Sequence, residues 1–211
     1  MKQFAQQTIN AITITSSPFG ESDCIATLYS REHGLLKCIA KRARNPKNPY
    51  RNLTTPLGHG EFTLSKGKNT LFRFHEGTIT HHYFALRTNR EALDSACGML
   101  DAIRTTQLEL HPSPPLYDLL YCYLQLVNTI QNPKSVLSSF LLKLLLHEGL
   151  ISITADTITP QLTQLSAEEV EAIFFLAYNR NSTQLTAHAL SEVVHATIHY
   201  LFDALTATHQ T

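Results

Sequence analysis

The chain has 211 residues, of which 43% are apolar and only 16% are charged. This composition excludes an intrinsically disordered protein and allows one large domain or two small ones. Basic and acidic side chains both number 17, and a net charge of zero by itself argues against a nucleic-acid-binding protein. The charges are unevenly placed, however. Residues 1–90 hold 13 basic against 5 acidic side chains, a balance of +8, and residues 91–211 hold 4 against 12, a balance of −8. This asymmetry indicates that the two halves have different partners.

The first 80 residues predict a β-sheet domain. Five short segments have the length of strands, and the first of them alternates and is rich in β-branched side chains: 9–15, 23–30, 35–41, 61–65 and 70–78. Residues 18–20 (Pro-Phe-Gly) are expected to end the first strand, Gly34 to supply the positive φ of a tight turn, and residues 66–69 to form a hairpin turn. Residues 42–56 contain three prolines and are expected to form a long polar loop. Five short strands in this length favour a small closed barrel, the OB-fold.

After these strands the apolar pattern takes a helical period. Helices are expected over five segments: 89–108, 116–130, 135–146, 166–178 and 186–205. The fourth opens with a capping-box sequence, Ser166 followed three residues later by Glu169, and Gly149 is expected to stop the third. Residues 150–165 are Thr-rich and have a β-like pattern instead.

The change from strand to helix period coincides with the change in the sign of the charge. Two independent features therefore place a boundary in the same part of the chain. The sequence predicts an α+β protein with an OB-fold nucleic-acid-binding domain over residues 1–80 and an all-α helical domain over residues 81–211.

Cysteines and apolar stretches bear on the location of the protein. Four cysteines stand at positions 24, 38, 97 and 122 without a CxxC pair, and they are expected to be reduced, buried thiols. The first ten residues contain no apolar segment typical of a secretory signal. The longest apolar stretch, 140–146, is interrupted by Lys143 and is far shorter than the roughly 20 residues of a membrane-spanning helix. These features predict a cytoplasmic protein that does not enter a membrane.

A basic segment marks the predicted barrel. No acidic side chain stands between Glu32 and Glu61, and this interval holds six Lys and Arg. With the rings of Tyr50, Phe72 and Phe74, the barrel has the components of a single-strand site, in which cations neutralise phosphates and rings stack on bases. The candidate phosphate contacts are Lys37, Lys41, Arg42, Arg44, Lys47, Arg51, Lys66, Lys68 and Arg73. The alternative is a solvated loop whose charges serve only solubility.

The sequence offers little for catalysis. Four polar residues would share one face of the last helix: His188, Glu192, His195 and His199. The i, i+4 spacing of His195 and His199 can hold zinc, but Glu does not follow His195, so the HExxH pattern of metallohydrolases is absent. The same residues fit the polar face of an amphipathic helix, with a metal-dependent hydrolase as the rival interpretation. A nucleophile elbow and a phosphate-binding glycine loop are also missing. We therefore expect no enzyme activity, no cofactor and no bound metal.

Three stretches of the predicted barrel match a known pattern in order and spacing. They are residues 19–23 (Phe-Gly-Glu-Ser-Asp), 28–35 (Leu-Tyr-Ser-Arg-Glu-His-Gly-Leu) and 40–44 (Ala-Lys-Arg-Ala-Arg). In these residues the chain resembles the RecO family of bacterial recombinational repair proteins. That family typically shows a Tyr/Phe-Gly-Glu-x-Asp turn, a Thr/Ser-x-Glu-x-Gly hairpin and an Ala-Lys-Gly-x-Arg strand end. Arg42 stands where the family usually has glycine. The resemblance is sharp over roughly residues 9–80 and only architectural beyond them.

The resemblance implies an N-terminal OB-fold, a helical C-terminal domain and no enzyme activity in the usual sense. It implies binding of single- and double-stranded DNA and annealing of complementary strands. It also implies that the protein works with RecR to load RecA onto DNA coated by single-stranded-DNA-binding protein. The acidic helical domain is then expected to dock proteins, among them the C-terminal tail of single-stranded-DNA-binding protein, at local cations. The candidates are Arg104, Lys134, Lys143 and Arg180.

One feature of the related family is missing, and three alternative functions stay open. Many family members carry a four-cysteine zinc module after the helix that ends here at Gly149, but no cysteine follows Cys122. The helical domain is therefore expected to lack that module. Cations and stacking rings do not distinguish DNA from RNA, so an RNA-binding OB-fold protein is the first alternative. The metal-dependent hydrolase that would use the histidine face is the second, and an adaptor that binds only proteins is the third.

Overall fold

The computed structural model describes residues 6–67, 71–81, 83–152, 165–178 and 191–208. The contacts group the chain into two compact units. The first unit comprises Met1–Ala85 together with Thr106–Asp118, and the second comprises Leu86–Thr105 together with Leu119–Thr211. The predicted division between residues 80 and 81 thus differs from this grouping mainly by the segment Thr106–Asp118.

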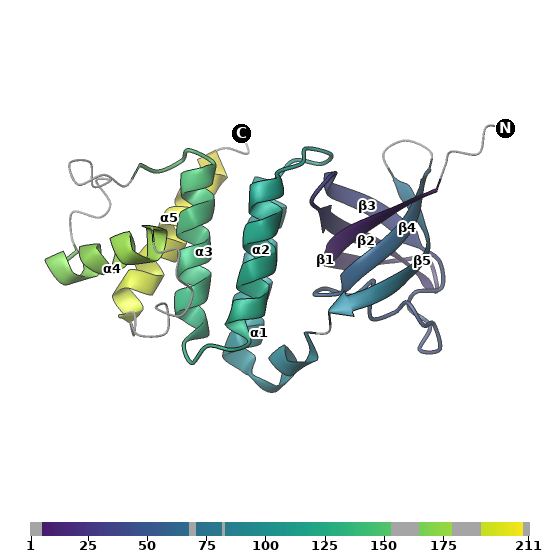
Figure 1. Ribbon diagram of the computed structural model, residues 1–211, viewed down its shortest axis with the longest axis horizontal. Coiled ribbons are helices and arrows are strands. Elements are labelled where there is room, and N and C mark those ends of the chain that lie inside the picture. Colours follow the sequence, from purple (N-terminus) through teal and green to yellow (C-terminus); the bar gives the residue numbers. More distant parts are fainter. Residues whose placement is uncertain (1–5, 68–70, 82, 153–164, 179–190, 209–211) are drawn as a thin grey trace. The chain divides into compact units, whose positions relative to one another are not determined.

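Five strands form a closed barrel in the first unit (Figure 1). They are β1 (Gln7–Phe19), β2 (Asp23–Ser30), β3 (Gly34–Ala40), β4 (His59–Lys66) and β5 (Phe72–His81). The order around the barrel is β1-β2-β3-β5-β4, with β3 and β5 parallel and the other pairs antiparallel. The interior is filled by buried side chains, Ile9, Ala11, Ala26, Leu28, Leu36, Cys38, Leu53, Phe62 and Leu64. The predicted five-stranded OB-fold barrel is confirmed.

The end of β1 was predicted wrongly. Residues 18–20 were expected to break the strand after Thr15, but β1 continues through Pro18 to Phe19. Pairing with β4 covers only Gln7–Ile12, whereas pairing with β2 extends to Phe19. Pro18 therefore lies where β1 has a single strand neighbour, and a residue without an N–H group is tolerated at such an edge.

The long loop between β3 and β4 is fixed to the barrel. Leu53 is fully buried in the barrel core, so the middle of the loop is anchored by apolar packing. The buried hydroxyl of Thr13 donates a hydrogen bond of 2.6 Å to the carbonyl oxygen of Leu53, and the Thr13 N–H group donates to the carbonyl oxygen of Gly58 over 2.7 Å. The predicted loop is confirmed, and this packing and these hydrogen bonds hold its backbone against the barrel.

A segment distant in sequence, Thr106–Asp118, completes the first unit, and we call it the barrel-bound segment. The N–H group of Leu110 donates a 2.8 Å hydrogen bond to the carbonyl oxygen of Leu35, at the start of β3. Gly34 precedes this contact with a φ of +67°, as predicted for the turn, and the backbone of His111 lies directly against its α-carbon. The glycine thus serves both the turn and the close approach of the two backbones.

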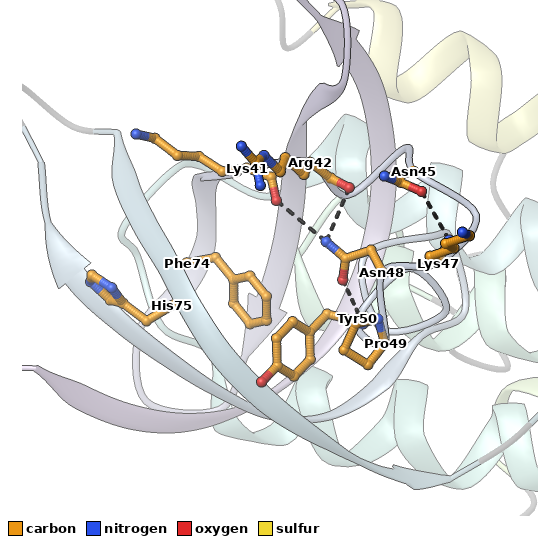
Figure 2. Close-up of a pocket in the computed structure, with 9 residues that line it drawn as sticks. All are labelled: Lys41, Arg42, Asn45, Lys47, Asn48, Pro49, Tyr50, Phe74 and His75. Atoms are coloured by element: carbon orange, nitrogen blue, oxygen red, sulfur yellow. Dashed lines mark hydrogen bonds between the residues drawn. The ribbon is translucent and has the colours of Figure 1, made fainter.

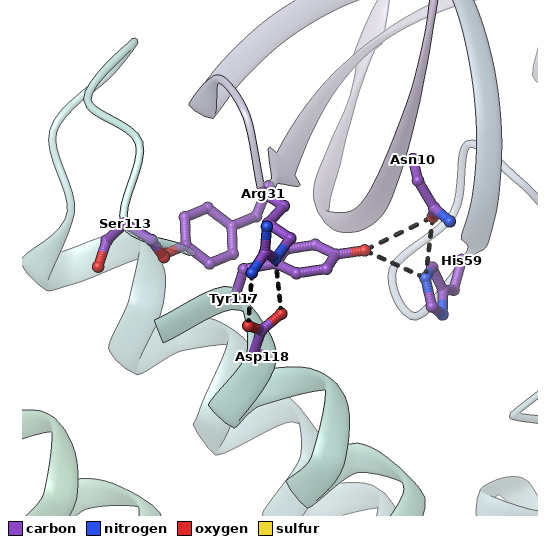
Figure 3. Close-up of polar contacts among 7 residues, drawn as sticks. Asn10, Arg31, His59, Ser113, Tyr117 and Asp118 are labelled. Carbon is purple, nitrogen blue, oxygen red and sulfur yellow. Dashed lines mark hydrogen bonds and ion pairs between the residues drawn. The ribbon is translucent and has the colours of Figure 1, made fainter. Parts of the chain in front are cut away.

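Side chains add a polar contact between this segment and the barrel (Figure 3). The guanidinium group of Arg31 donates two hydrogen bonds to the carboxylate of Asp118, of 2.9 and 3.1 Å. The hydroxyl group of Tyr117 lies 3.3 Å from Nε2 of His59 and 3.5 Å from Oδ1 of Asn10. Because Oδ1 of Asn10 can only accept, the 3.1 Å contact between Asn10 and His59 requires a proton on His59 Nε2.

This buried imidazole predicts a pH-dependent barrel. Burial and the nearby His81 lower the pKa of His59 from 6.5 to about 4. Between these pH values the unfolded chain takes up a proton that the folded barrel does not, so stability decreases as pH falls through this range and is fully present above it. Urea unfolding followed by circular dichroism should show a loss on the order of 3 kcal/mol attributable to His59 between pH 7 and pH 4.

A His59→Gln variant isolates this contribution, because glutamine can donate a hydrogen bond to Asn10 but does not titrate. Other carboxylates and histidines change protonation in the same range in both proteins. The informative quantity is therefore the free energy of unfolding of the parent minus that of the variant. This difference should be more positive at pH 7 than at pH 4. Parallel pH profiles for the two proteins would contradict the assignment.

The second unit is helical, as predicted. After a short 3-10 helix, Phe84–Thr88, the helices of the chain are α1 (Arg90–Thr106), α2 (Pro114–Val127), α3 (Pro133–His147), α4 (Ala167–Tyr178) and α5 (Glu192–Thr208), and the start of α2 belongs to the barrel-bound segment. Helix α3 packs against α4 and α5 and is buried on nearly every side, which fits its mostly apolar sequence. The capping box is confirmed, since the N–H group of Glu169 donates to Oγ of Ser166 and the N–H group of Ser166 donates to the Glu169 carboxylate.

Some predictions for this unit were wrong or fall outside the structure's range. Cys97 and Cys122 are exposed, whereas only Cys24 and Cys38 are buried, so two of the four thiols depart from the expectation. Cys97 lies off the buried face of α1, which runs through Ala92, Ala96, Met99 and Ile103. Of the Thr-rich segment 150–165, residues 153–164 lie outside the described part, as do residues 186–190 of the last predicted helix. No helix in the described ranges is both long and apolar enough to cross a membrane.

Candidate nucleic-acid interface

A pocket of about 320 Å³ lies between the β3–β4 loop and β5 (Figure 2). It is lined by Lys41, Arg42, Asn45, Lys47, Asn48, Pro49, Tyr50, Phe74 and His75. Three of the nine candidate phosphate contacts and two of the three candidate stacking rings therefore share one site. No acidic side chain contributes to the lining, so the positive charge is not neutralised there.

Two consecutive Asn-Pro-x turns shape the loop beside this pocket. Oδ1 of Asn45 accepts a 3.0 Å hydrogen bond from the N–H group of Lys47, and Oδ1 of Asn48 accepts a 2.8 Å bond from that of Tyr50. In each turn an asparagine side chain caps the backbone two residues on, a local motif that this residue forms readily. The third residue of each turn, a cation in the first and a ring in the second, lines the pocket.

The side chain of Asn48 also fixes the opposite rim of the pocket. Its Nδ2 donates to the carbonyl oxygens of Lys41 and Arg42, over 3.4 and 3.0 Å (Figure 2). With its bond to Tyr50, this one amide connects the end of β3 to the aromatic wall. Its hydrogen-bonding groups are thus used to build the pocket.

Arg42 and Arg44 are close in sequence but differ in role. Arg42 has a φ of +53°, and its backbone N–H group donates a 2.8 Å hydrogen bond to Oδ1 of Asp23. Its guanidinium group has no acidic partner within the described part of the chain. The guanidinium group of Arg44 donates to the carbonyl oxygens of Gly20 and Glu21, over 3.5 and 3.3 Å, and so supports the β1–β2 turn.

The remaining candidate phosphate contacts lie elsewhere on the barrel. Lys37 forms an ion pair with Glu109 of the barrel-bound segment. Arg51, Lys66 and Arg73 are exposed and form no ion pair with any described residue. Lys68 lies outside the described residues. The structure therefore concentrates three of the predicted cations at the pocket and spreads the others.

The three candidate rings differ in what they touch. Phe72 and Phe74 are partly buried and pack against the barrel core. The ring of Phe74 meets that of Phe62 at 5.7 Å and that of Tyr50 at 5.4 Å, both edge to face. Tyr50 is half-buried, and among the described residues its one aromatic neighbour is Phe74. Tyr50 is therefore the ring with most freedom to stack on a ligand, while Phe72 serves the core.

Sequence reasoning missed several residues of this site. Asn45, Asn48 and His75 were not among the candidates, although the two Asn-Pro dipeptides signalled turns. Nε2 of His75 lies 2.7 Å from Oγ of Ser65 on the neighbouring strand β4, a contact that only strand pairing could reveal.

The candidate partner-binding cations are not brought together by the helical unit. Arg104 pairs with Asp101 at 3.1 Å, and Lys134 pairs with Glu192 at 2.7 Å. The ammonium group of Lys143 lies 5.3 Å from the centre of the Tyr123 ring. Arg180 lies outside the described residues. Each described member of this set therefore already interacts within its own unit.

The predicted histidine face is partly buried. Nδ1 of His195 forms a hydrogen bond with Oγ of Ser138, and its ring lies 4.4 Å from that of His199. Burial lowers the pKa of both imidazoles, that of His195 to about 4. His188 is outside the described ranges. Within those ranges no three His, Cys, Asp or Glu side chains are placed together as metal ligands, and the expectation of a metal-free chain stays a prediction.

Comparisons with known proteins agree on one family. Residues 1–83 match the family model described as Recombination protein O N terminal. The DNA repair protein RecO of Chlamydia trachomatis serovar L2 is 30% identical over 149 residues, which cover 71% of this chain and 61% of that protein. The protein of the same name from Desulfitobacterium hafniense is 31% identical over 140 residues, covering 66% of this chain and 50% of the relative. The chain thus spans about half to three fifths of the length of these relatives.

Proposed function

Since the chain belongs to the RecO family, we propose that it is a DNA-binding recombination mediator in DNA repair. In this role it binds single- and double-stranded DNA and anneals complementary single strands. Together with RecR it helps to load RecA onto DNA coated by single-stranded-DNA-binding protein. We propose that it catalyses no reaction and that it acts in the cytoplasm.

One observation supports DNA binding most directly. Lys41, Arg42 and Lys47 surround a pocket that has an aromatic wall and no acidic lining. Unpaired cations attract the phosphate backbone by releasing its counterions, and an accessible ring provides a surface for a base. Arg51, Lys66 and Arg73 are exposed on the same barrel and offer further phosphate contacts. The barrel therefore has the charge, the ring and the loop geometry that a single strand needs.

We propose that the helical unit docks protein partners instead of DNA. The residues of this unit, 86–105 and 119–211, hold 6 basic against 10 acidic side chains, and this balance of −4 repels phosphate over roughly a Debye length, about 8 Å at physiological salt. RecR and the C-terminal tail of single-stranded-DNA-binding protein are the proposed partners. At Arg104 or Lys134 an acidic tail would have to displace Asp101 or Glu192 from an existing ion pair. Lys143, which lies over the Tyr123 ring, offers a cation beside an apolar surface.

Binding to a fluorescently labelled oligo-dT should depend steeply on salt. If the three pocket cations alone contact phosphate, the slope of log affinity against log salt concentration should be about −2, and more contacts on the barrel would make it steeper. Fluorescence anisotropy across a salt series measures this slope. Competition with an RNA oligomer of matched sequence then tests the sugar preference.

The outcomes separate the proposal from its alternatives. Tighter binding of DNA than of RNA is expected. A clear preference for RNA would favour the RNA-binding alternative, because a site that uses the 2′-hydroxyl group distinguishes the two sugars. An absence of binding to any oligomer at low salt would favour the adaptor and contradict the proposed function.

A further inference from the structure

The size of the pocket limits what it can hold. Its volume of about 320 Å³ is at the lower end of the roughly 300–1,000 Å³ typical of small-molecule sites. One OB-fold contacts about 4–16 nucleotides of a bound strand. The pocket therefore accommodates a single nucleotide of such a strand, and the rest of the strand must follow the barrel surface outside it.

The wall of the pocket is suited to a flat, uncharged group. The ring of Tyr50 meets Phe74 edge to face, an arrangement in which the two ring planes stand at 85°. Pro49 extends the apolar surface beside it. The hydroxyl group of Tyr50 has no hydrogen-bond partner among the described residues. The ring is thus held by its neighbours while part of it faces the pocket, as a stacking platform requires.

The rim of the pocket is suited to phosphate. Lys41 and Arg42 stand at the end of β3, and Lys47 belongs to the first Asn-Pro-x turn, so cations come from two sides of the aromatic wall. Asn48 connects both sides through its three hydrogen bonds, which keeps the cations and the ring in a fixed arrangement. The amide nitrogen of Asn45 has no partner among the described residues and is available to the edge of a base.

We infer that this pocket is a subsite for one unpaired base of a single strand, which stacks on Tyr50 while Lys41, Arg42 and Lys47 hold the adjacent phosphates. The inference rests on the proposed nucleic-acid binding and adds a specificity to it. In a duplex each base is already stacked and paired, and bringing one into the pocket would require flipping it out of the helix, which breaks both its stacking and its pairing. The subsite therefore favours single strands over duplex, whereas exposed cations elsewhere on the barrel bind both.

A Tyr50→Leu variant tests the stacking role, because leucine keeps an apolar side chain at the wall but removes the aromatic face. Affinity for oligo-dT should fall about 10-fold, the scale of losing one stacked base, while affinity for a duplex of the same length stays within about twofold. Equal losses for both DNA forms would overturn the inference and leave Tyr50 as a support for the loop. Unchanged affinity for oligo-dT would overturn it as well.

A second variant reports base stacking by a change in fluorescence instead of by a loss of affinity. The chain contains no tryptophan, so Tyr50→Trp introduces a single fluorophore at the wall of the pocket. Stacking of a base should quench its emission when oligo-dT is added, and an oligomer of abasic sites with the same number of phosphates should not. Tyr200→Trp is the matched control, because Tyr200 is 66% exposed on the helical unit and should give no quenching.

The two measurements keep the inference distinct from the proposed function. If anisotropy shows that labelled oligo-dT binds but the emission of the Tyr50→Trp variant does not change, the subsite is wrong and the proposed DNA binding stands. If anisotropy shows no binding at low salt, the proposed function fails and the subsite fails with it.

Discussion

Replacing Lys41, Arg42 and Lys47 together by alanine is expected to lower the affinity for single-stranded DNA roughly 100-fold at low salt. Each charge-assisted contact to phosphate contributes on the order of 1 kcal/mol or more, and the three side chains have no acidic partner among the described residues. Their removal should also make the salt slope shallower by about 2. The loss should be similar for different sequences, because phosphate contacts carry no base information. Fluorescence anisotropy at several salt concentrations gives both numbers.

A matched control separates the pocket from the net charge of the protein. The triple variant Arg90→Ala, Arg104→Ala, Lys134→Ala removes an equal number of positive charges from the helical unit, where each of the three is paired with a carboxylate. Its affinity for DNA should stay close to that of the parent. If both triple variants lose affinity to the same extent, general electrostatic attraction carries binding and the assignment to the pocket is wrong.

The strands and helices were largely predictable because their signals are local. The breaking residues 18–20 before β2 and the turn glycine at position 34 after it are enough to place β2 and β3 to within a residue. The capping box of Ser166 and Glu169 likewise forms within four residues of sequence. A closed barrel was predictable from the number and length of the strands, because closing five short strands into a barrel leaves no strand edge unpaired.

The barrel-bound segment was not predictable from such local signals. It joins the barrel through single contacts between distant residues, such as Tyr117 with His59 and Arg31 with Asp118. Neither pair leaves a periodic pattern in the sequence, and residues 106–113 lack the apolar run by which a buried strand is recognised. Only the folded chain brings them together.

The candidate site was predictable in composition but not in geometry. The absence of acidic residues between Glu32 and Glu61 drew attention to six cations, of which the structure places three at the pocket. Which of them converge depends on the hydrogen bonds of Asn48 and on the backbone of Arg42. The positive φ of Arg42 also explains why the related family usually has glycine at this position, since a left-handed conformation costs a residue with a side chain about 1–2 kcal/mol. This chain has Arg42 at the position instead, which places a cation at the rim of the pocket but makes the left-handed turn less favourable than it would be with glycine.

Gly34→Ala is expected to lower the unfolding free energy of the barrel unit by about 2–4 kcal/mol. The φ of +67° is unfavourable for alanine, and the added Cβ would overlap the carbonyl oxygen of His111 and lie 2.6 Å from its carbonyl carbon. Both atoms belong to the backbone of the barrel-bound segment, so the clash cannot be relieved by rotating a side chain. The hydrogen bond from Leu110 to Leu35 should weaken as the two backbones move apart.

Gly20→Ala is the control for the conformational part of this cost. Gly20 has a similar φ of +59°, but a Cβ there would meet no atom within 4 Å, so a loss of only about 1 kcal/mol is expected. Urea unfolding measures the two losses, and hydrogen exchange of the Leu110 amide reports on the barrel-bound segment itself. That amide should exchange faster in Gly34→Ala and at the parent's rate in Gly20→Ala. Equal destabilisation by the two variants, with the Leu110 amide protected in both, would mean that the segment does not depend on Gly34 for its close approach to the barrel.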